Sequence, residues 1–96
     1  MSWRSITITG DDAHDAASTR LIRALEQCHH DAGKPDDAEV FHRRHGDGSH
    51  TYYFSPAASR IASSLLEREQ AVACSEPTGV DRLVRVRLDA DADAGV

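Results

Sequence analysis

Three histidines and both tyrosines of this 96-residue chain gather in one short stretch, FHRRHGDGSHTYYF at residues 41–54. Imidazoles bind divalent metal ions and exchange protons near neutral pH, and a tyrosine hydroxyl donates hydrogen bonds. These residue types are therefore suited to a metal site or to a small-molecule site. No nucleophile motif, phosphate-binding glycine loop or zinc-binding cysteine pattern occurs in the sequence. Any chemistry of the protein depends on how residues 41–54 fold.

Asp47 and Gly48 lie between two runs of aromatic and β-branched residues, a pattern typical of a β-hairpin with a two-residue turn. With these two residues in the turn, His45 faces His50 across the strands, with Cβ atoms roughly 4.5–5.5 Å apart. Two imidazoles at that distance predict a Zn²⁺ or Ni²⁺ site, with Asp47 as the nearest third ligand. The alternative is a solvated hairpin tip, because a shift of register by one residue would separate the histidines. No other cofactor is predicted.

The same register divides the hairpin into two faces. One face is expected to carry Phe41, Arg43, His45, His50, Tyr52 and Phe54, and the other Val40, His42, Arg44, Thr51, Tyr53 and Ser55. On the second face His42 lies opposite Tyr53. This pair supplies the candidate base and hydrogen-bond donor for an alternative interpretation, a small dimeric enzyme of the α+β-barrel type.

Three consecutive aromatic residues, Tyr52 to Phe54, must place large rings on both faces of a sheet. Helices cover one face, so the open face exposes at least one ring unless something binds there. We expect a second copy of the chain to cover it, since two-fold dimers are the commonest soluble oligomers. A small molecule, a protein partner, or a tyrosine hydroxyl left in water are the alternatives. The residues predicted for this interface or binding surface are Phe41, Arg43, Tyr52, Tyr53, Phe54, Arg85 and Arg87.

The remaining elements follow from the pattern of apolar residues. Residues 3–9 alternate and are rich in β-branched side chains, which predicts a strand. Apolar residues then recur at helical spacing from residue 13 to about residue 30. Ser55 followed by Pro56 is typical of the start of a second helix, and residues 80–89 alternate again as a final strand.

This order, β-α-β-β-α-β, predicts a ferredoxin-like α+β fold with a four-stranded antiparallel sheet and two helices on one face. Residues 71–75 are ambiguous, because they fit either a further helical turn or a short extra strand. We expect one domain over residues 1–88, followed by an acidic, disordered tail over residues 89–96.

The formal net charge of −5 argues against non-specific binding to phosphate backbones or anionic lipids. The basic-glycine-aromatic run of RNA-binding sheets is also missing, so nucleic acid is not an expected partner. No signal peptide is evident, and no apolar run approaches the roughly 20 residues of a membrane span. The two cysteines make neither a disulfide framework nor a metal motif. We therefore expect a small cytoplasmic, non-enzymatic binding or regulatory domain that acts through its open sheet face.

Overall fold

The computed structural model describes residues 3–9, 12–78 and 83–88, with residues 12–15 described by their backbone alone. The elements in chain order are β1 (Trp3–Ile8), α1 (Asp12–Asp31), β2 (Val40–Arg44), β3 (His50–Phe54), α2 (Pro56–Ile61), α3 (Ser63–Arg68), β4 (Val72–Cys74) and β5 (Leu83–Val86). The predicted tail, residues 89–96, lies outside the described residues. In the described part of the chain, no helix has the length and apolar character needed to cross a membrane.

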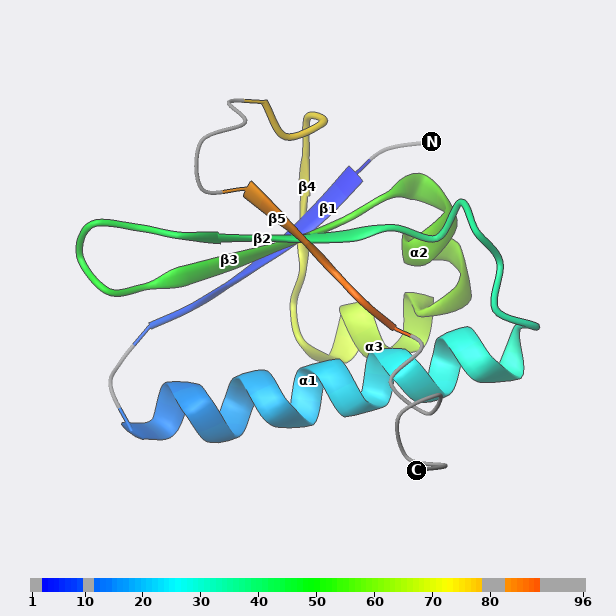
Figure 1. Cartoon of the computed structure of the whole chain (residues 1–96), viewed down its shortest axis with the longest axis horizontal. Helices are drawn as coiled ribbons and strands as arrows, with labels where there is room; N and C mark the ends of the chain where they lie inside the picture. The colour runs from blue at the N-terminus through cyan, green and yellow to red at the C-terminus, as the bar shows by residue number, and fades with distance from the viewer. Residues whose placement is uncertain (1–2, 10–11, 79–82, 89–96) are drawn as a thin grey trace.

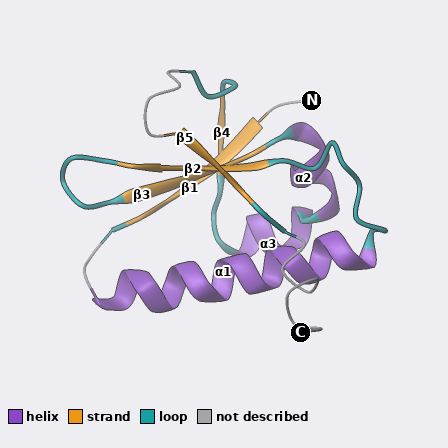
Figure 2. Cartoon of the chain, viewed as in Figure 1, coloured by secondary structure: helices purple, strands orange, loops and turns teal. Residues whose placement is uncertain are grey.

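The strands form one antiparallel sheet in the order β4-β1-β3-β2-β5. Helices α1 and α3 lie on one side of the sheet in Figure 1, and Figure 2 separates the same two layers by colour. The α+β class is as predicted, but the predicted four-stranded layout is not confirmed, because the sheet has a fifth strand. The ambiguous segment forms β4 and pairs with the outer edge of β1, so the final strand β5 joins the sheet at the opposite edge, beside β2.

Alternate side chains of the strands face the helices and form the core. The buried hydrophobic residues are Ile6, Leu21, Leu25, Ala38, Val40, Tyr52, Phe54, Ala57, Ala58, Ala62, Leu65, Leu66 and Leu88. Among them Phe54, Leu66 and Val40 are fully buried, which places the centre of the core between β3, β2 and α3. Removing such apolar surface from water stabilises the fold by about 25 cal/mol per Å².

The second helical segment begins where the sequence predicts. The Ser55 hydroxyl accepts a hydrogen bond from the backbone N–H of Ala58 at 3.2 Å, and Pro56 occupies the first helical turn. One continuous helix was expected, whereas the structure has two short ones that meet at Ala62. The φ and ψ angles of Ala62, −114° and 26°, depart from helical values, and this change ends α2 and starts α3.

The hairpin turn differs from the predicted two-residue turn. The backbone N–H of Gly48 donates to the carbonyl of His45 at 3.1 Å, and the N–H of His45 donates to the carbonyl of Ser49 at 2.9 Å. Residues 46–48 therefore form a three-residue loop, and Gly48 has the positive φ of 91° that such a loop requires at its last position. This loop shifts the pairing of β2 with β3 by one residue, so the predicted register is wrong.

Asp47 at the tip of the loop is held by its neighbour. Its Oδ1 accepts hydrogen bonds from the Ser49 hydroxyl at 2.6 Å and from the Ser49 backbone N–H at 2.9 Å. These bonds, the hydroxyl first, lower the pKa of the Asp47 carboxyl below its ordinary value of 3.8. Because the folded pKa is the lower one, ionised Asp47 stabilises the turn above pH 3.8 and loses this contribution as the pH falls through the folded value.

The loop gives a paired test of its geometry. Replacing Gly48 by alanine is expected to lower the free energy of unfolding by about 1–2 kcal/mol, because a Cβ atom is unfavourable at positive φ. Gly46 lies in the same loop with no positive φ, and a Cβ atom there would meet nothing within 4 Å, so Gly46→Ala is the control. Urea denaturation of both variants measures the difference between their free energies of unfolding. If Gly46→Ala lowered the free energy of unfolding as much as Gly48→Ala does, the three-residue loop would be contradicted.

Candidate functional site

The shift of register separates the two histidines predicted to share a metal ion. Arg44, not His45, lies opposite His50. His45 points to the other face of the hairpin, where its Nε2 lies 2.6 Å from the hydroxyl of Thr51. Asp47, the predicted third ligand, is engaged with Ser49. Among the residues that the structure describes, no group of three or more His, Cys, Asp or Glu side chains is arranged to hold a metal ion.

A different pair of histidines comes together instead. His42 and His50 lie on the helix side of the sheet, with stacked ring centroids 4.7 Å apart and Nε2 of His42 in contact with Nδ1 of His50. A hydrogen bond between ring nitrogens needs one N–H and one lone pair, so this contact couples the tautomers of the two rings. His42 also lies against Tyr52, at 4.9 Å between centroids, whereas Tyr53 is on the opposite face. The proposed His42–Tyr53 pair of an enzyme is therefore not assembled in the chain.

The sheet face that the described helices leave uncovered, called the open face below, carries an aromatic group. Trp3 on β1 and Phe41 on β2 approach to 5.9 Å between ring centroids, and Tyr53 on the central strand β3 lies directly opposite Phe41. All three rings are half-buried. The guanidinium carbon of Arg43 lies 5.8 Å from the centroid of the Tyr53 ring, close enough for a cation–π contact.

The predicted interface residues divide between the two faces. Phe41, Arg43, Tyr53 and Arg85 lie on the open face, as their register positions require. Tyr52 and Phe54 instead face the helices, where they are 6% and 0% exposed. Arg87 follows the end of β5 and lies outside the strand.

Trp3 was not among the predicted residues. The alternation of β1 could have identified it, because Trp3 must point away from the face that carries the buried Ile6.

Small polar side chains lie beside the rings. Thr51 and Ser5 are 5% and 9% exposed although they point to the open face. The hydroxyl of Thr51 is 3.0 Å from that of Thr7 on β1 and also contacts His45. The Arg43 guanidinium donates a hydrogen bond to the carbonyl of Thr78, so the chain that follows β4 lies beside β2.

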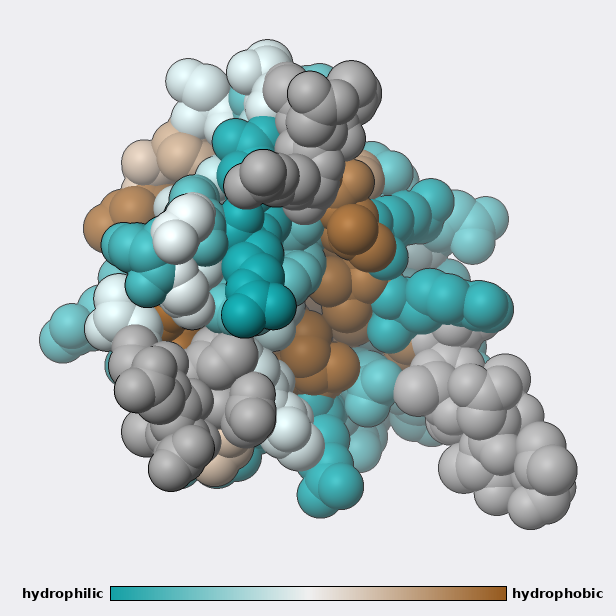
Figure 3. Space-filling view, turned by 60° about the vertical axis from the view of Figure 1, so that its left-hand side comes forward, coloured by the Kyte–Doolittle hydropathy of each residue, from teal (hydrophilic) through white to brown (hydrophobic). Residues whose placement is uncertain are grey.

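The edges of the sheet also present apolar side chains. Figure 3 shows hydrophobic residues that reach the surface between hydrophilic ones. Val72 on β4 and Val84 on β5 are 60% and 59% exposed, and these strands are the two edges of the sheet. The apolar surface that can bind another molecule is therefore not limited to the aromatic rings.

Comparison with known proteins gives no match to a protein-family model, a curated protein or a solved structure.

Proposed function

We propose that the protein is a non-enzymatic binding domain that forms a homodimer through its open face. The observation that carries the proposal is the group of Trp3, Phe41 and Tyr53, which lies where the described helices give no cover. These are three of the five aromatic residues of the chain, which has one Trp, two Tyr and two Phe. Aromatic rings are enriched at protein interfaces and supply much of their binding energy.

The charges on the open face are compatible with contact between two copies. Arg85 lies 3.8 Å from the carboxylate of Glu39, which offsets its charge. Arg43 is held against the Tyr53 ring and the Thr78 carbonyl, so its guanidinium is already engaged within the chain.

The order β4-β1-β3-β2 supports a ferredoxin-like arrangement, to which β5 adds one strand at the edge. We include that fold in the proposal, together with a cytoplasmic location, which the free cysteines Cys28 and Cys74 support.

Phe41→Arg is expected to convert the dimer into a monomer, because it places a charge in the centre of the aromatic group. Light scattering behind a sizing column, with a chelator present, should give about twice the chain mass of 10.5 kDa for the wild type and the chain mass for the variant. Ser64→Arg adds the same charge at an exposed position on α3 and is expected to remain dimeric. Circular dichroism verifies that both variants are folded. A wild-type protein that stays monomeric at high concentration would overturn the proposal, and so would a dimeric Phe41→Arg.

A further inference from the structure

The segment that follows β4 crosses the open face. Strands β4 and β2 are separated in the sheet by β1 and β3. The carbonyl of Thr78, which comes shortly after the end of β4 at Cys74, nevertheless accepts a hydrogen bond from the Arg43 guanidinium on β2. Figure 1 shows this segment on the side of the sheet away from α1. Residues 75–78 are called the strap below.

The strap reaches the middle of the open face. The Arg43 guanidinium lies over the Tyr53 ring on the central strand, 5.8 Å from its centroid, so the Thr78 carbonyl that it contacts is above the centre of the sheet. From Cys74 to Thr78 an extended chain spans at most roughly 14 Å. Strand β3 lies two strand spacings from β4, which is roughly 10 Å. The strap is therefore long enough to pass over β1 but has little length for a detour around the end of the sheet.

Burial on the open face agrees with this position. The Nε atom of Arg43 is buried, although the described helices lie on the other side of the sheet. Pro77, the apolar residue of the strap, is half-buried, whereas Ser75, Glu76 and Thr78 are exposed. These values fit a segment that lies on the sheet and shields the Arg43 side chain from water.

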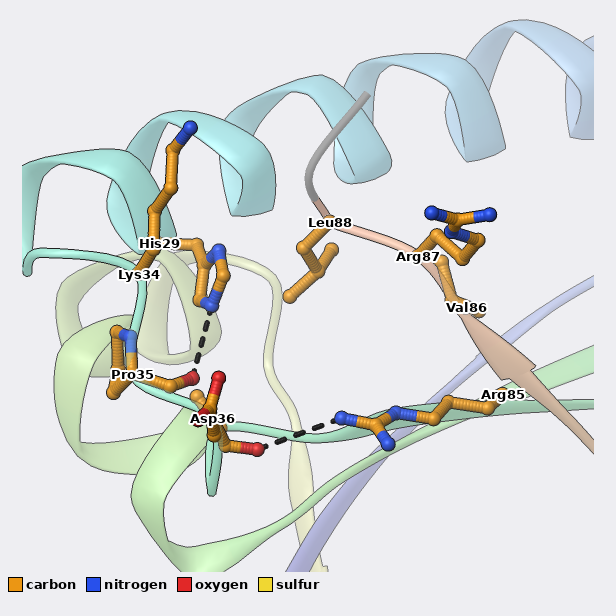
Figure 4. A pocket seen from close by; sticks show the side chains of 9 residues that line it. His29, Lys34, Pro35, Asp36, Arg85, Val86, Arg87 and Leu88 are labelled. Carbon is orange, nitrogen blue, oxygen red and sulfur yellow. Dashed lines mark hydrogen bonds between the residues drawn. The ribbon is translucent and has the colours of Figure 1, made fainter. Parts of the chain in front are cut away.

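Arg43 is the arginine that fastens the strap. Arg85, which also points to the open face, lies at the edge of the sheet instead. Its guanidinium donates to the carbonyl of Asp36 at 3.5 Å (Figure 4) and lies 3.8 Å from the carboxylate of Glu39. Both interactions tie Arg85 to the chain between α1 and β2, so the strap does not depend on them.

We propose that the strap is an intrachain cover that competes with the second copy of the chain, and that the contact between Arg43 and Thr78 regulates how readily the dimer forms. This inference rests on the proposed homodimer. Two sheets that pack face to face lie about 10 Å apart, and their side chains fill the layer between them. A backbone segment that lies on Arg43 occupies this layer, so the strap must move away before the rings of two copies meet.

The requirement applies to each copy. The dissociation constant of the dimer therefore includes the fraction of open strap in both chains, and a change that favours the open strap acts twice. Substitutions that release the strap are expected to strengthen the dimer, which is the opposite of what loss of an interface contact does.

The first test is the dissociation constant of Arg43→Gln, measured by light scattering over a concentration series. It is expected to fall roughly tenfold or more, because each copy loses a hydrogen bond from a charged group to the strap. Arg44→Gln removes the same charge from an exposed residue on the other face of β2 and should leave the constant unchanged. Circular dichroism verifies that the variants are folded.

Pro77→Gly tests the strap without changing a residue of the sheet. Glycine has more conformational freedom than proline when the strap is released, so this variant should also strengthen the dimer. If neither Arg43→Gln nor Pro77→Gly strengthens the dimer, the proposal is overturned.

A second readout does not depend on dimerisation. Trp3, the one tryptophan of the chain, lies opposite Cys74, after which the strap begins. At a concentration where the chain is monomeric, quenching of its fluorescence by neutral acrylamide is expected to increase in Arg43→Gln and Pro77→Gly but not in Arg44→Gln. Unchanged quenching in the first two variants would overturn the strap and leave the homodimer standing. Increased quenching in variants that stay monomeric at high concentration would overturn the homodimer, and with it this regulation.

Discussion

Replacing Phe54 by alanine is expected to lower the free energy of unfolding by about 3–5 kcal/mol. Phe54 is 0% exposed and belongs to the central strand β3, opposite Val40 on β2 and Arg4 on β1. The alanine would leave a cavity where the sheet meets the helices, and the surrounding strands limit how far it can collapse. Since small domains are stable by only about 5–15 kcal/mol, we expect a large shift of the midpoint in urea denaturation.

Phe41→Ala is the matched control, because it changes the same residue type on the neighbouring strand. Phe41 is half-buried on the open face, so its loss of stability is expected to be about 1 kcal/mol. The two-residue turn would place Phe41 opposite Phe54 on one face, whereas the structure pairs Phe41 with Tyr53. Both variants are measured at a concentration where dimer formation is negligible. Similar losses of unfolding free energy for the two variants would favour the register of the two-residue turn, which the structure excludes.

Ser55→Ala is expected to lower the free energy of unfolding by about 2–4 kcal/mol, more than the loss of a helix cap alone. The Ser55 hydroxyl accepts from the backbone N–H of Ala58 and of Glu39, at 3.2 and 2.9 Å, and donates to the carbonyl of Asp37 at 3.1 Å. The residue is 3% exposed, so the alanine would leave buried backbone groups without partners. One hydroxyl therefore fixes the start of α2 against the chain that leads into β2.

Ser64→Ala is the control for this second substitution, because Ser64 is exposed on α3. It is expected to change the free energy of unfolding by less than about 0.5 kcal/mol. Denaturation curves of the two serine variants, recorded by circular dichroism, give the comparison. If Ser55→Ala lowers the free energy of unfolding no more than Ser64→Ala does, the hydrogen bonds of Ser55 do not hold the start of α2 against the chain that leads into β2.

The elements that the sequence predicts well are those with local signals. The alternation of β1, the helical spacing of α1 and the Ser55–Pro56 helix start depend on neighbouring residues, and all three are confirmed. The hairpin register was not predictable in the same way. The segment 45–49, HGDGS, fits both a two-residue and a three-residue turn, and the choice is tied to which side chains of β3 pack against the helices.

The fifth strand depends on a contact between distant segments. The three residues of β4 have no pattern that distinguishes a strand from a helical turn, and their structure is decided by the free edge of β1. Likewise, the aromatic run of β3 predicts rings on both faces, but only the packing of the helices determines that Tyr52 is buried and Tyr53 is half-buried. The sequence therefore predicts which strand carries the rings, and the packing of the helices decides which of those rings lie on the open face.

The edge position of β5 has a consequence for the exchange of amide hydrogens. Among the strands that the structure describes, β5 pairs only with β2, so it can detach while the order β4-β1-β3-β2 stays intact. Such local opening needs less free energy than global unfolding, and the amides of β5 should exchange with solvent earlier than those of β3. Arg85 and Val86 belong to β5 and, together with His29, Pro35 and Ala38, line a pocket, so each opening of this strand would remove one wall of that pocket. A molecule bound there would therefore protect the amides of β5 by holding the strand in place.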